Sequence, residues 1–194
     1  MEHKTDITGI ILAGGKSSRM GTDKGFLKLD GETFISHIIN AVKPLVNDII
    51  IVSNNPEYDR FNLKRIEDIM MDAGPLAGLY SGLYHSKTEN NIVLSCDVPL
   101  INTTVLKKLS RQAAKDVDIV QIESNNKTMP LIALYKKHCM HQCLELLETG
   151  ERRLRFAVSQ FKTKTIVLDQ HLHRYVKNIN TINQLNALKN EVKH

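Results

Sequence analysis

The sequence predicts an α/β protein whose mostly parallel sheet carries an antiparallel addition and has helices on both faces. Short apolar runs alternate with helical patterns along the chain, which is typical of βαβ units. Turn residues close the runs, and no repeat, linker or low-complexity stretch interrupts their order. We therefore expect a single domain over residues 1–194.

The composition is that of an ordinary globular protein, with 42% hydrophobic and 24% charged residues. A net charge of +5 favours anionic ligands, but aromatic residues are scarce at 5% and no block of like charges marks a nucleic-acid tail. No signal peptide or bilayer-length apolar run is visible, and three cysteines suggest free thiols in a reducing compartment. We expect a soluble cytoplasmic protein that binds neither nucleic acid nor membrane.

The first apolar run, Ile7 to Leu12, predicts a buried strand that ends in the small residues Ala13, Gly14 and Gly15. Spaced cations follow this turn, namely Lys16, Arg19, Lys24 and Lys28. Backbone N–H groups and cations in this order suit a polyphosphate. The dinucleotide pattern G-x-G-x-x-G does not fit because the two glycines are adjacent, and the P-loop pattern would place Gly9 inside the strand.

The later elements follow from spacing and turn residues. Thr33 is the expected N-cap of a helix over 34–43, and Pro75 the expected first residue of another. Further helices are predicted over 57–61, 103–114, 138–149 and from Thr181 to about Val192. Strands are predicted over 48–52, 63–67, 91–95, 117–123, 131–135 and 164–168. The polar turn at 124–127 predicts an antiparallel hairpin appended to the parallel sheet.

Three polar residues stand at predicted strand ends, where ligands bind in open α/β sheets. Asp97 follows the fourth strand, and Asn54 and Asp68 follow the second and third. A carboxylate facing a triphosphate is repelled unless a divalent cation lies between them, so we expect Asp97 to hold Mg²⁺. An isolated Asp-x-Pro is usually an ordinary turn, but its place at the strand end favours a site. Asn54 and Asp68 are expected to contact the base or ribose.

Two later clusters of polar residues each have a simpler structural interpretation. Gly150 is followed by Arg152, Arg153 and Arg155, which could be a solvated helix start or a bidentate phosphate site. We favour an acceptor-phosphate role for Arg152 and Arg153. The cluster of His138, Cys139, His141 and Cys143 lacks a second ligand pair with suitable spacing, so these are interpreted as ordinary helix residues.

The stretch from Leu12 to Lys24 matches L-A-G-G-x-S-x-R-M-G-x-D-K and resembles the signature loop of the molybdenum cofactor guanylyltransferases, the MobA family. Four further segments resemble this family: G-P-L-A-G at 74–78, C-D-x-P at 96–99, G-E-R-R at 150–153 and N-I-N-T at 178–181. The last departs from N-x-N-T-P-x-E/D-L, because Ile182 replaces the proline and Gln184 the acidic residue. These departures affect the helix start more than Asn178 and Asn180.

The resemblance implies a Rossmann-like nucleotidyltransferase fold. It implies transfer of GMP from GTP to the terminal phosphate of molybdenum-bound molybdopterin, with pyrophosphate released. Molybdoenzymes or their chaperones would be protein partners. The family's C-D-x-P aspartate binds Mg²⁺ and nucleotide, a role that carries over to Asp97, and the G-E-R-R and N-I-N-T segments carry acceptor binding over to Arg152, Arg153, Asn178 and Asn180.

Charge and position suggest the remaining roles. Arg19 and Lys24, with the amides of Gly14 and Gly15, would bind the triphosphate and the departing pyrophosphate. The backbones of Leu12 and Ala13 would offer hydrogen bonds to the base.

Three alternatives stay open. A related enzyme could use CTP, as a molybdopterin cytidylyltransferase, or a sugar-phosphate acceptor. A non-catalytic GTP-binding module is opposed by the joint presence of Arg19, Lys24 and Asp97, because binding alone does not require all three. Nucleic-acid binding is a distant third.

Overall fold

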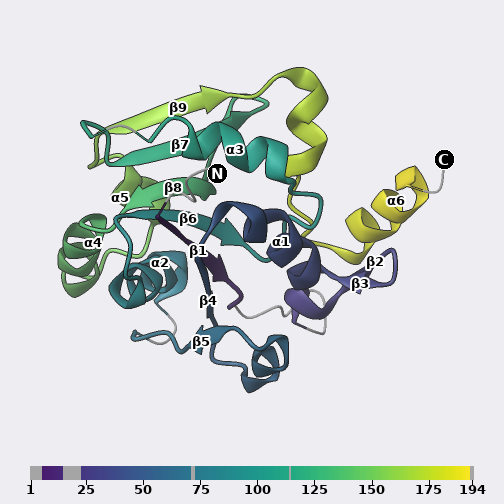
Figure 1. The fold of residues 1–194 in the computed structure, drawn as a ribbon, viewed down its shortest axis with the longest axis horizontal. Helices are drawn as coiled ribbons and strands as arrows, with labels where there is room; N and C mark the ends of the chain where they lie inside the picture. The colour runs from purple at the N-terminus through teal and green to yellow at the C-terminus, as the bar shows by residue number, and fades with distance from the viewer. Residues whose placement is uncertain (1–5, 15–22, 71–72, 114, 193–194) are drawn as a thin grey trace.

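The structure is a computed structural model that describes residues 6–14, 23–70, 73–113 and 115–192. Within these residues the main sheet has seven strands in the order β5–β4–β1–β6–β8–β7–β9 (Figure 1). Their bounds are β1 (Ile7–Leu12), β4 (Asp48–Val52), β5 (Lys64–Ile66), β6 (Asn90–Ser95), β7 (Ile119–Ser124), β8 (Lys127–Lys136) and β9 (Thr163–Val167). The first four neighbours are parallel, β8 is antiparallel to both β6 and β7, and β9 is parallel to β7.

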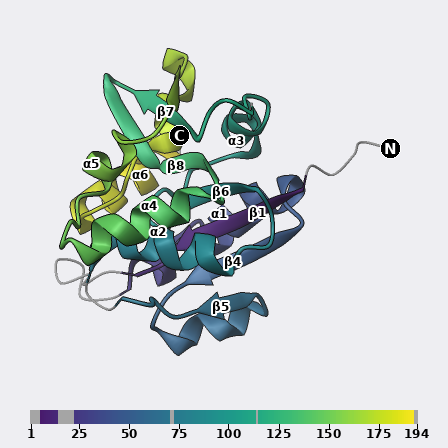
Figure 2. The same cartoon turned by 90° about the vertical axis from the view of Figure 1, so that its left-hand side faces the viewer.

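Helices cover both faces of this sheet, as predicted. One face carries α1 (Phe34–Val42) and α3 (Thr103–Ser110); the other carries α2 (Gly74–His85), α4 (Cys139–Glu148) and α5 (Leu154–Val158) (Figures 1 and 2). Helix α6 (Ile182–Val192) lies apart from the sheet, beside the hairpin of β2 (Lys28–Leu29) and β3 (Glu32–Thr33). Short 3₁₀ segments complete the fold: η1 (Lys24–Phe26), η2 (Lys43–Leu45), η3 (Pro56–Phe61) and η4 (Gln170–Val176).

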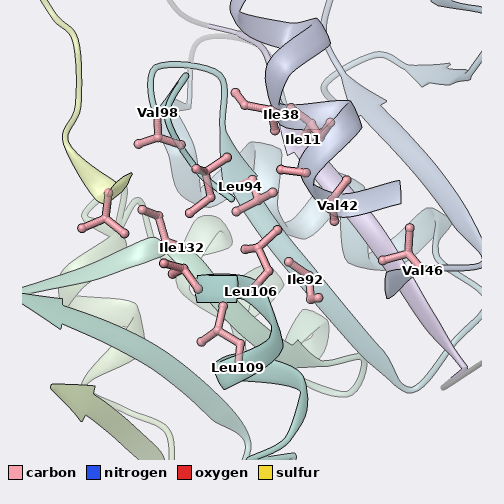
Figure 3. Close-up of a cluster of buried hydrophobic side chains, with 14 of the residues drawn as sticks. Ile11, Ile38, Val42, Val46, Ile92, Leu94, Val98, Leu106, Leu109 and Ile132 are labelled. Carbon is pink, nitrogen blue, oxygen red and sulfur yellow. The ribbon is translucent and has the colours of Figure 1, made fainter. Parts of the chain in front are cut away.

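The packing of the core explains why the strands appear in the sequence as continuous apolar runs. Ile11 of β1 packs on the α1 and α3 side, against Ile38 and Leu94 (Figure 3), whereas its neighbours Ile10 and Leu12 pack on the α2 side. A strand buried on both faces has no polar side to alternate with, as in other parallel sheets. The sheet is thereby fixed between two apolar layers, and its carboxyl edge is left to carry polar residues.

Several predicted elements are confirmed closely. The second strand spans Asp48–Val52, and Thr33 caps α1 by accepting a hydrogen bond from the Ser36 N–H at 3.3 Å. The 124–127 hairpin is confirmed, with Asn125 and Asn126 both at positive φ (51° and 59°) in its turn. Asparagine tolerates this conformation better than most residues, which is why the turn could be read from the sequence.

The hairpin is joined to the parallel sheet as predicted, because β8 pairs antiparallel with β6, the last of the parallel strands β5, β4, β1 and β6. The predicted start of that strand, Leu131, was wrong: β8 begins at Lys127 and runs through Pro130. Proline lacks the N–H that a ladder needs, and it is accommodated here by a break in register between Gln121 and Ile122.

Other differences concern helix ends and short elements. Helix α3 ends at Ser110 instead of continuing to 114, and neither α5 nor η4 was predicted. Elements of five and seven residues leave little helical periodicity to detect. In the part of the chain that the structure describes, no helix has the length and apolarity to cross a bilayer.

Candidate functional site

The carboxyl ends of four parallel strands form one polar edge. The ladder continues one residue past each strand, because Ala13 N–H donates to the Val52 carbonyl at 2.9 Å and Cys96 N–H to the Leu12 carbonyl at 3.1 Å. A third bond, from Ser53 N–H to the Ile66 carbonyl at 2.9 Å, does the same between β4 and β5. The residues that follow, among them Asn54, Asp68 and Asp97, therefore leave the sheet from closely aligned positions.

Asp97 is buried, with 8% of its surface exposed, and is surrounded by donors. Ser95 Oγ donates to its Oδ1 at 2.6 Å, and Asn178 Nδ2 lies 3.1 Å from each carboxylate oxygen. The backbone of the same segment is also bound, because Ile179 N–H donates to the Asp97 carbonyl at 2.8 Å. The segment from 177 to 181 is thus held across the end of β6.

Lys24 joins this cluster from the opposite end of the chain. Its Nζ donates to Asn180 Oδ1 at 2.6 Å and lies 3.8 Å from Asp97 Oδ2. The predicted residues Lys24, Asp97, Asn178 and Asn180 are therefore brought together in one cluster. Sequence analysis assigned the two asparagines to the acceptor; the structure shows that they also contact the predicted phosphate-binding lysine and the predicted metal-binding carboxylate.

A cleft of about 580 Å³ opens beside this cluster, at the ends of β1, β4 and β5. Five residues predicted to bind nucleotide line it: Leu12, Ala13, Gly14, Asn54 and Asp68. Its opposite wall is the start of α2, which contributes Gly74, Pro75 and Gly78. Further along this helix, a Cβ on Gly82 would overlap the Ile10 side chain, so glycine there lets α2 pack closely on β1.

Asn54 and Asp68 are linked to each other. Asp68 N–H donates to Asn54 Oδ1 at 2.8 Å, and Ser81 Oγ of α2 lies 3.0 Å from Asp68 Oδ1. Burial raises the pKa of Asp68 above its ordinary value of 3.8, and the bond with Ser81 opposes this shift in part. The Asp68 carboxylate is therefore an oriented acceptor in the wall of the cleft.

A larger groove of about 1260 Å³ also adjoins the Asp97 cluster, because Ser95, Asn178 and Asn180 are among the residues that line it. It has apolar walls and is lined by the cations Lys127, Arg153, Arg155, Arg174 and Lys177. No carboxylate is found among the described residues that line it. Cleft and groove share Pro75, Ser95 and Leu131, and Ser95 binds Asp97 directly, so the two hollows meet at the Asp97 cluster.

The two predicted arginines have different surroundings. Arg153 lines the groove and pairs with Glu151 at 2.6 Å, and its hydrogen bonds lower the pKa of Glu151 to about 2. Arg152 instead donates to the Leu147 carbonyl at 2.7 Å and caps the end of α4. Gly15 and Arg19, also predicted to bind phosphate, lie outside the described residues.

Sequence reasoning missed the other groove cations. Arg155 is fixed against β8, where Nη1 donates to Thr128 Oγ1 at 2.7 Å and Nη2 to the Thr128 carbonyl at 2.8 Å. Arg155 stands two residues beyond Arg153 in the same basic run, and this run was the only sequence feature that could have indicated its role. No sequence pattern indicated that Arg174 and Lys177 line the groove, because only the course of η4 brings them there.

The donor set suits a magnesium ion better than a transition metal. No group of three His, Cys, Asp or Glu side chains able to hold a metal occurs in the described ranges. Burial raises the pKa of the Cys139 and Cys143 thiols to about 12, which keeps them protonated in the core. Magnesium needs only one or two carboxylates besides phosphate oxygens and waters, and Asp97 offers one beside the cleft.

Three comparisons with known proteins agree with this geometry. Residues 9–164 match the family model "MobA-like NTP transferase domain". The chain is 35% identical over 182 residues to a "Probable molybdenum cofactor guanylyltransferase" of Flavobacterium johnsoniae, covering 94% of this chain and 96% of the relative. It is 29% identical over 188 residues to a "Molybdenum cofactor guanylyltransferase" of Vibrio parahaemolyticus, covering 95% of this chain and 96% of that protein.

Solved structures share the fold. A protein of Aquifex aeolicus superposes with a TM-score of 0.80 at 25% identity, over 93% of this chain and 96% of the other. Molybdopterin-guanine dinucleotide biosynthesis protein A of Archaeoglobus fulgidus also gives 0.80, at 20% identity, over 96% of this chain and 98% of the other.

Proposed function

The chain belongs to the MobA-like NTP transferase family, and from this premise we propose that it transfers GMP from GTP to the terminal phosphate of molybdenum-bound molybdopterin. The observation that carries the proposal is the meeting of a polar cleft and a cation-lined groove at Asp97. A nucleotide in the cleft and an anionic acceptor in the groove would bring two phosphates together at this point. Names of relatives support the guanine base and the molybdopterin acceptor.

The reaction needs no protein nucleophile. An acceptor phosphate oxygen would attack the α-phosphorus of GTP, one P–O bond forming as the bond to pyrophosphate breaks. The protein would contribute position and charge, which can account for most of the barrier reduction in such a displacement. Lys24 would neutralise the triphosphate, Arg19 would assist from the signature loop, and the amides of Gly14 and Gly15 would bind phosphate oxygens.

Asp97 would hold Mg²⁺, with Asn178 and Ser95 orienting its carboxylate. When bound, the ion would draw charge from the phosphate oxygens. Asn54 and Asp68 would contact the base or ribose, and the backbones of Leu12 and Ala13 the base. Arg152, Arg153 and Asn180 would hold the acceptor, although the bond from Arg152 to Leu147 would have to be exchanged for one to the ligand.

The proposal also covers the cellular compartment and the protein partners. Three free cysteines, all buried, suit a reducing cytoplasm. Molybdoenzymes or their chaperones would receive the product.

Calorimetric titration with GTP, CTP, ATP and UTP, each with and without Mg²⁺, is the first test. Selective GTP binding that Mg²⁺ strengthens is the expected result. A preference for CTP would keep the mechanism but move the enzyme to cytidylyl transfer, and no nucleotide binding would refute the proposal. Pyrophosphate release with molybdopterin as acceptor then tests the transfer itself, and release with a sugar phosphate instead would redirect the assignment.

A further inference from the structure

We propose that Tyr58 is a positioning residue for Lys24, and that it acts through the carboxylate of Asp23. The four residues Asp23, Gly25, Asn55 and Tyr58 form what we call the aspartate latch. It fastens the end of the signature loop to η3, the 3₁₀ segment that follows β4. The inference rests on the proposed function in one respect, namely that Lys24 meets the triphosphate.

The latch provides Asp23 with three donors. Tyr58 Oη donates to Asp23 Oδ1 at 2.6 Å, and Gly25 N–H donates to the same oxygen at 3.0 Å. Asn55 Nδ2 donates to Oδ2 at 3.2 Å. Tyr58 and Asn55 stand more than thirty positions from Asp23 in the chain, so these bonds join two separate segments. Hydrogen bonds to a charged acceptor are among the stronger ones.

Packing holds the Tyr58 ring in one place. The ring is completely buried and stacks on Phe26 at a centroid distance of 4.5 Å. A Cβ on Gly25 would overlap the Tyr58 hydroxyl, so glycine is required where the backbone crosses it. Burial raises the pKa of Tyr58 far above its ordinary value, and the hydroxyl therefore keeps its proton and remains a donor.

Lys24 follows Asp23 directly and is the first residue of η1, so the latch sets where its side chain begins. From this anchor Nζ reaches Asn180 at 2.6 Å and Asp97 at 3.8 Å. Asp23 itself lines the nucleotide cleft. Loss of the Tyr58 hydroxyl would release this anchor, so that Lys24 is held less firmly and nucleotide binding weakens.

Tyr58→Phe removes only the hydroxyl and keeps the stack on Phe26. We expect the affinity for Mg²⁺–GTP, measured by calorimetry, to fall about tenfold, as for loss of one hydrogen bond to a charged group. The matched control is Thr88→Val, which removes a buried hydroxyl that donates to Thr8 Oγ1 at 2.8 Å. Thr8 lies near the amino ends of the parallel strands, away from the cleft. Thr88→Val should lower the melting temperature similarly and leave GTP affinity unchanged. Phe26→Leu keeps the Tyr58 hydroxyl but loosens its ring, and should give a smaller loss of affinity.

Two measurements separate positioning from general destabilisation. If Tyr58 acts through Lys24, adding Tyr58→Phe to Lys24→Ala should cost less than twofold further affinity. Reductive methylation, followed by mass spectrometry, should label Lys24 slowly in the parent protein and at the rate of exposed Lys28 in Tyr58→Phe. The second measurement needs no nucleotide.

The outcomes are distinct. Unchanged GTP affinity and unchanged Lys24 labelling in folded Tyr58→Phe would overturn the inference while leaving the proposed function intact. A full tenfold loss in the Lys24→Ala background would overturn it as well, because Tyr58 would then act independently of Lys24. Failure of the parent protein to bind GTP would instead refute the proposed function, and the labelling would still decide whether Tyr58 holds Lys24.

Discussion

The cleft and the groove that meet at Asp97 are built in different ways. The cleft is lined by backbone and short side chains at the ends of parallel strands, and its described lining contains two carboxylates, Asp23 and Asp68, but no lysine or arginine. The groove is lined by long cations from β8, α5, η4 and the segment after it. The register of neighbouring strands therefore fixes the cleft, whereas connecting segments bring the groove cations together.

This difference predicts two kinds of sensitivity. Residues of the cleft and of the Asp97 cluster have defined partners, so one substitution should remove one function sharply. The groove distributes its charge over several long side chains, and a single loss can be compensated in part by the others. The predictions below test this contrast, from the largest expected effect to the smallest.

Asp97→Ala and Lys24→Ala should each reduce GMP transfer by about 10³-fold, because each removes a charge from the point where cleft and groove meet. Steady-state pyrophosphate release gives the rate, and thermal unfolding shows whether the fold persists. Asp48→Ala, which removes an exposed carboxylate at the other end of β4, is the control and should leave turnover unchanged. Normal turnover by a well-folded Asp97→Ala protein would refute the metal assignment.

Replacing Arg155 and Arg174 together by alanine should raise the acceptor KM by about 100-fold, while each single change, partly compensated by the other cations, raises it only about threefold. GTP affinity should stay the same in all three proteins, because both arginines line the groove and neither lines the cleft. Lys107→Ala removes a cation of α3 outside the groove and serves as the control. A fall in GTP affinity with no change in acceptor KM would show that groove and cleft are assigned the wrong way round.

Asp68→Asn should lower GTP affinity by about tenfold and leave the acceptor KM unchanged. It also has a testable pH dependence. Because the folded-state pKa of Asp68 lies above the unfolded value, its favourable contribution is complete below about pH 3.8 and is lost as the pH rises through the raised pKa. Ionised Asp68 therefore costs stability, so the variant should gain more in melting temperature, relative to the parent, at pH 8 than at about pH 3.5. A gain that is larger at the lower pH would contradict this.

The same contrast explains how much the sequence could predict. The placement of Asn54, Asp68 and Asp97 could be predicted because parallel strands have their carboxyl ends at one edge, and this rule needs only the strand assignments. The position of each residue at the end of its strand was enough to predict its place, and no side-chain contact had to be known. The contacts of Asn178 with Asp97 and of Asn180 with Lys24 could not be derived, since they join residues 81 and 156 positions apart in the chain.

The cations of the groove were harder to predict from the sequence, for a physical reason. Arg153 was found only as part of a basic run, and the same run suggested Arg152, whose side chain caps α4. Arg155 reaches the groove because β8 runs through Pro130 and presents Thr128 to it, a course that sequence rules disfavour. Arg174 depends on η4, which has no apolar periodicity of its own. Cations placed by irregular segments leave little pattern to detect.

The smallest expected effect concerns the start of α6, where the chain departs from the family pattern. Thr181 and Gln184 form a reciprocal cap: Gln184 N–H donates to Thr181 Oγ1 at 3.2 Å, and Thr181 N–H donates to Gln184 Oε1, also at 3.2 Å. The same Gln184 oxygen accepts from Asn180 N–H at 2.7 Å. Gln184→Glu should raise the free energy of unfolding by about 0.5 kcal/mol, because a negative charge near a helix N-terminus is favourable. Gln184→Ala should lower it by about 1 kcal/mol.

Denaturant unfolding measures both changes, and turnover tells whether they reach Asn180. Since the glutamate keeps the acceptor oxygen that binds Asn180 N–H, turnover of Gln184→Glu should match the parent, whereas Gln184→Ala should lose severalfold as Asn180 is released from its contact with Lys24. If Gln184→Ala lost stability without any loss of turnover, the cap would serve the helix alone. The positioning of Asn180 would then depend on its bond to Lys24, and the Asp97 cluster would be held from the cleft side.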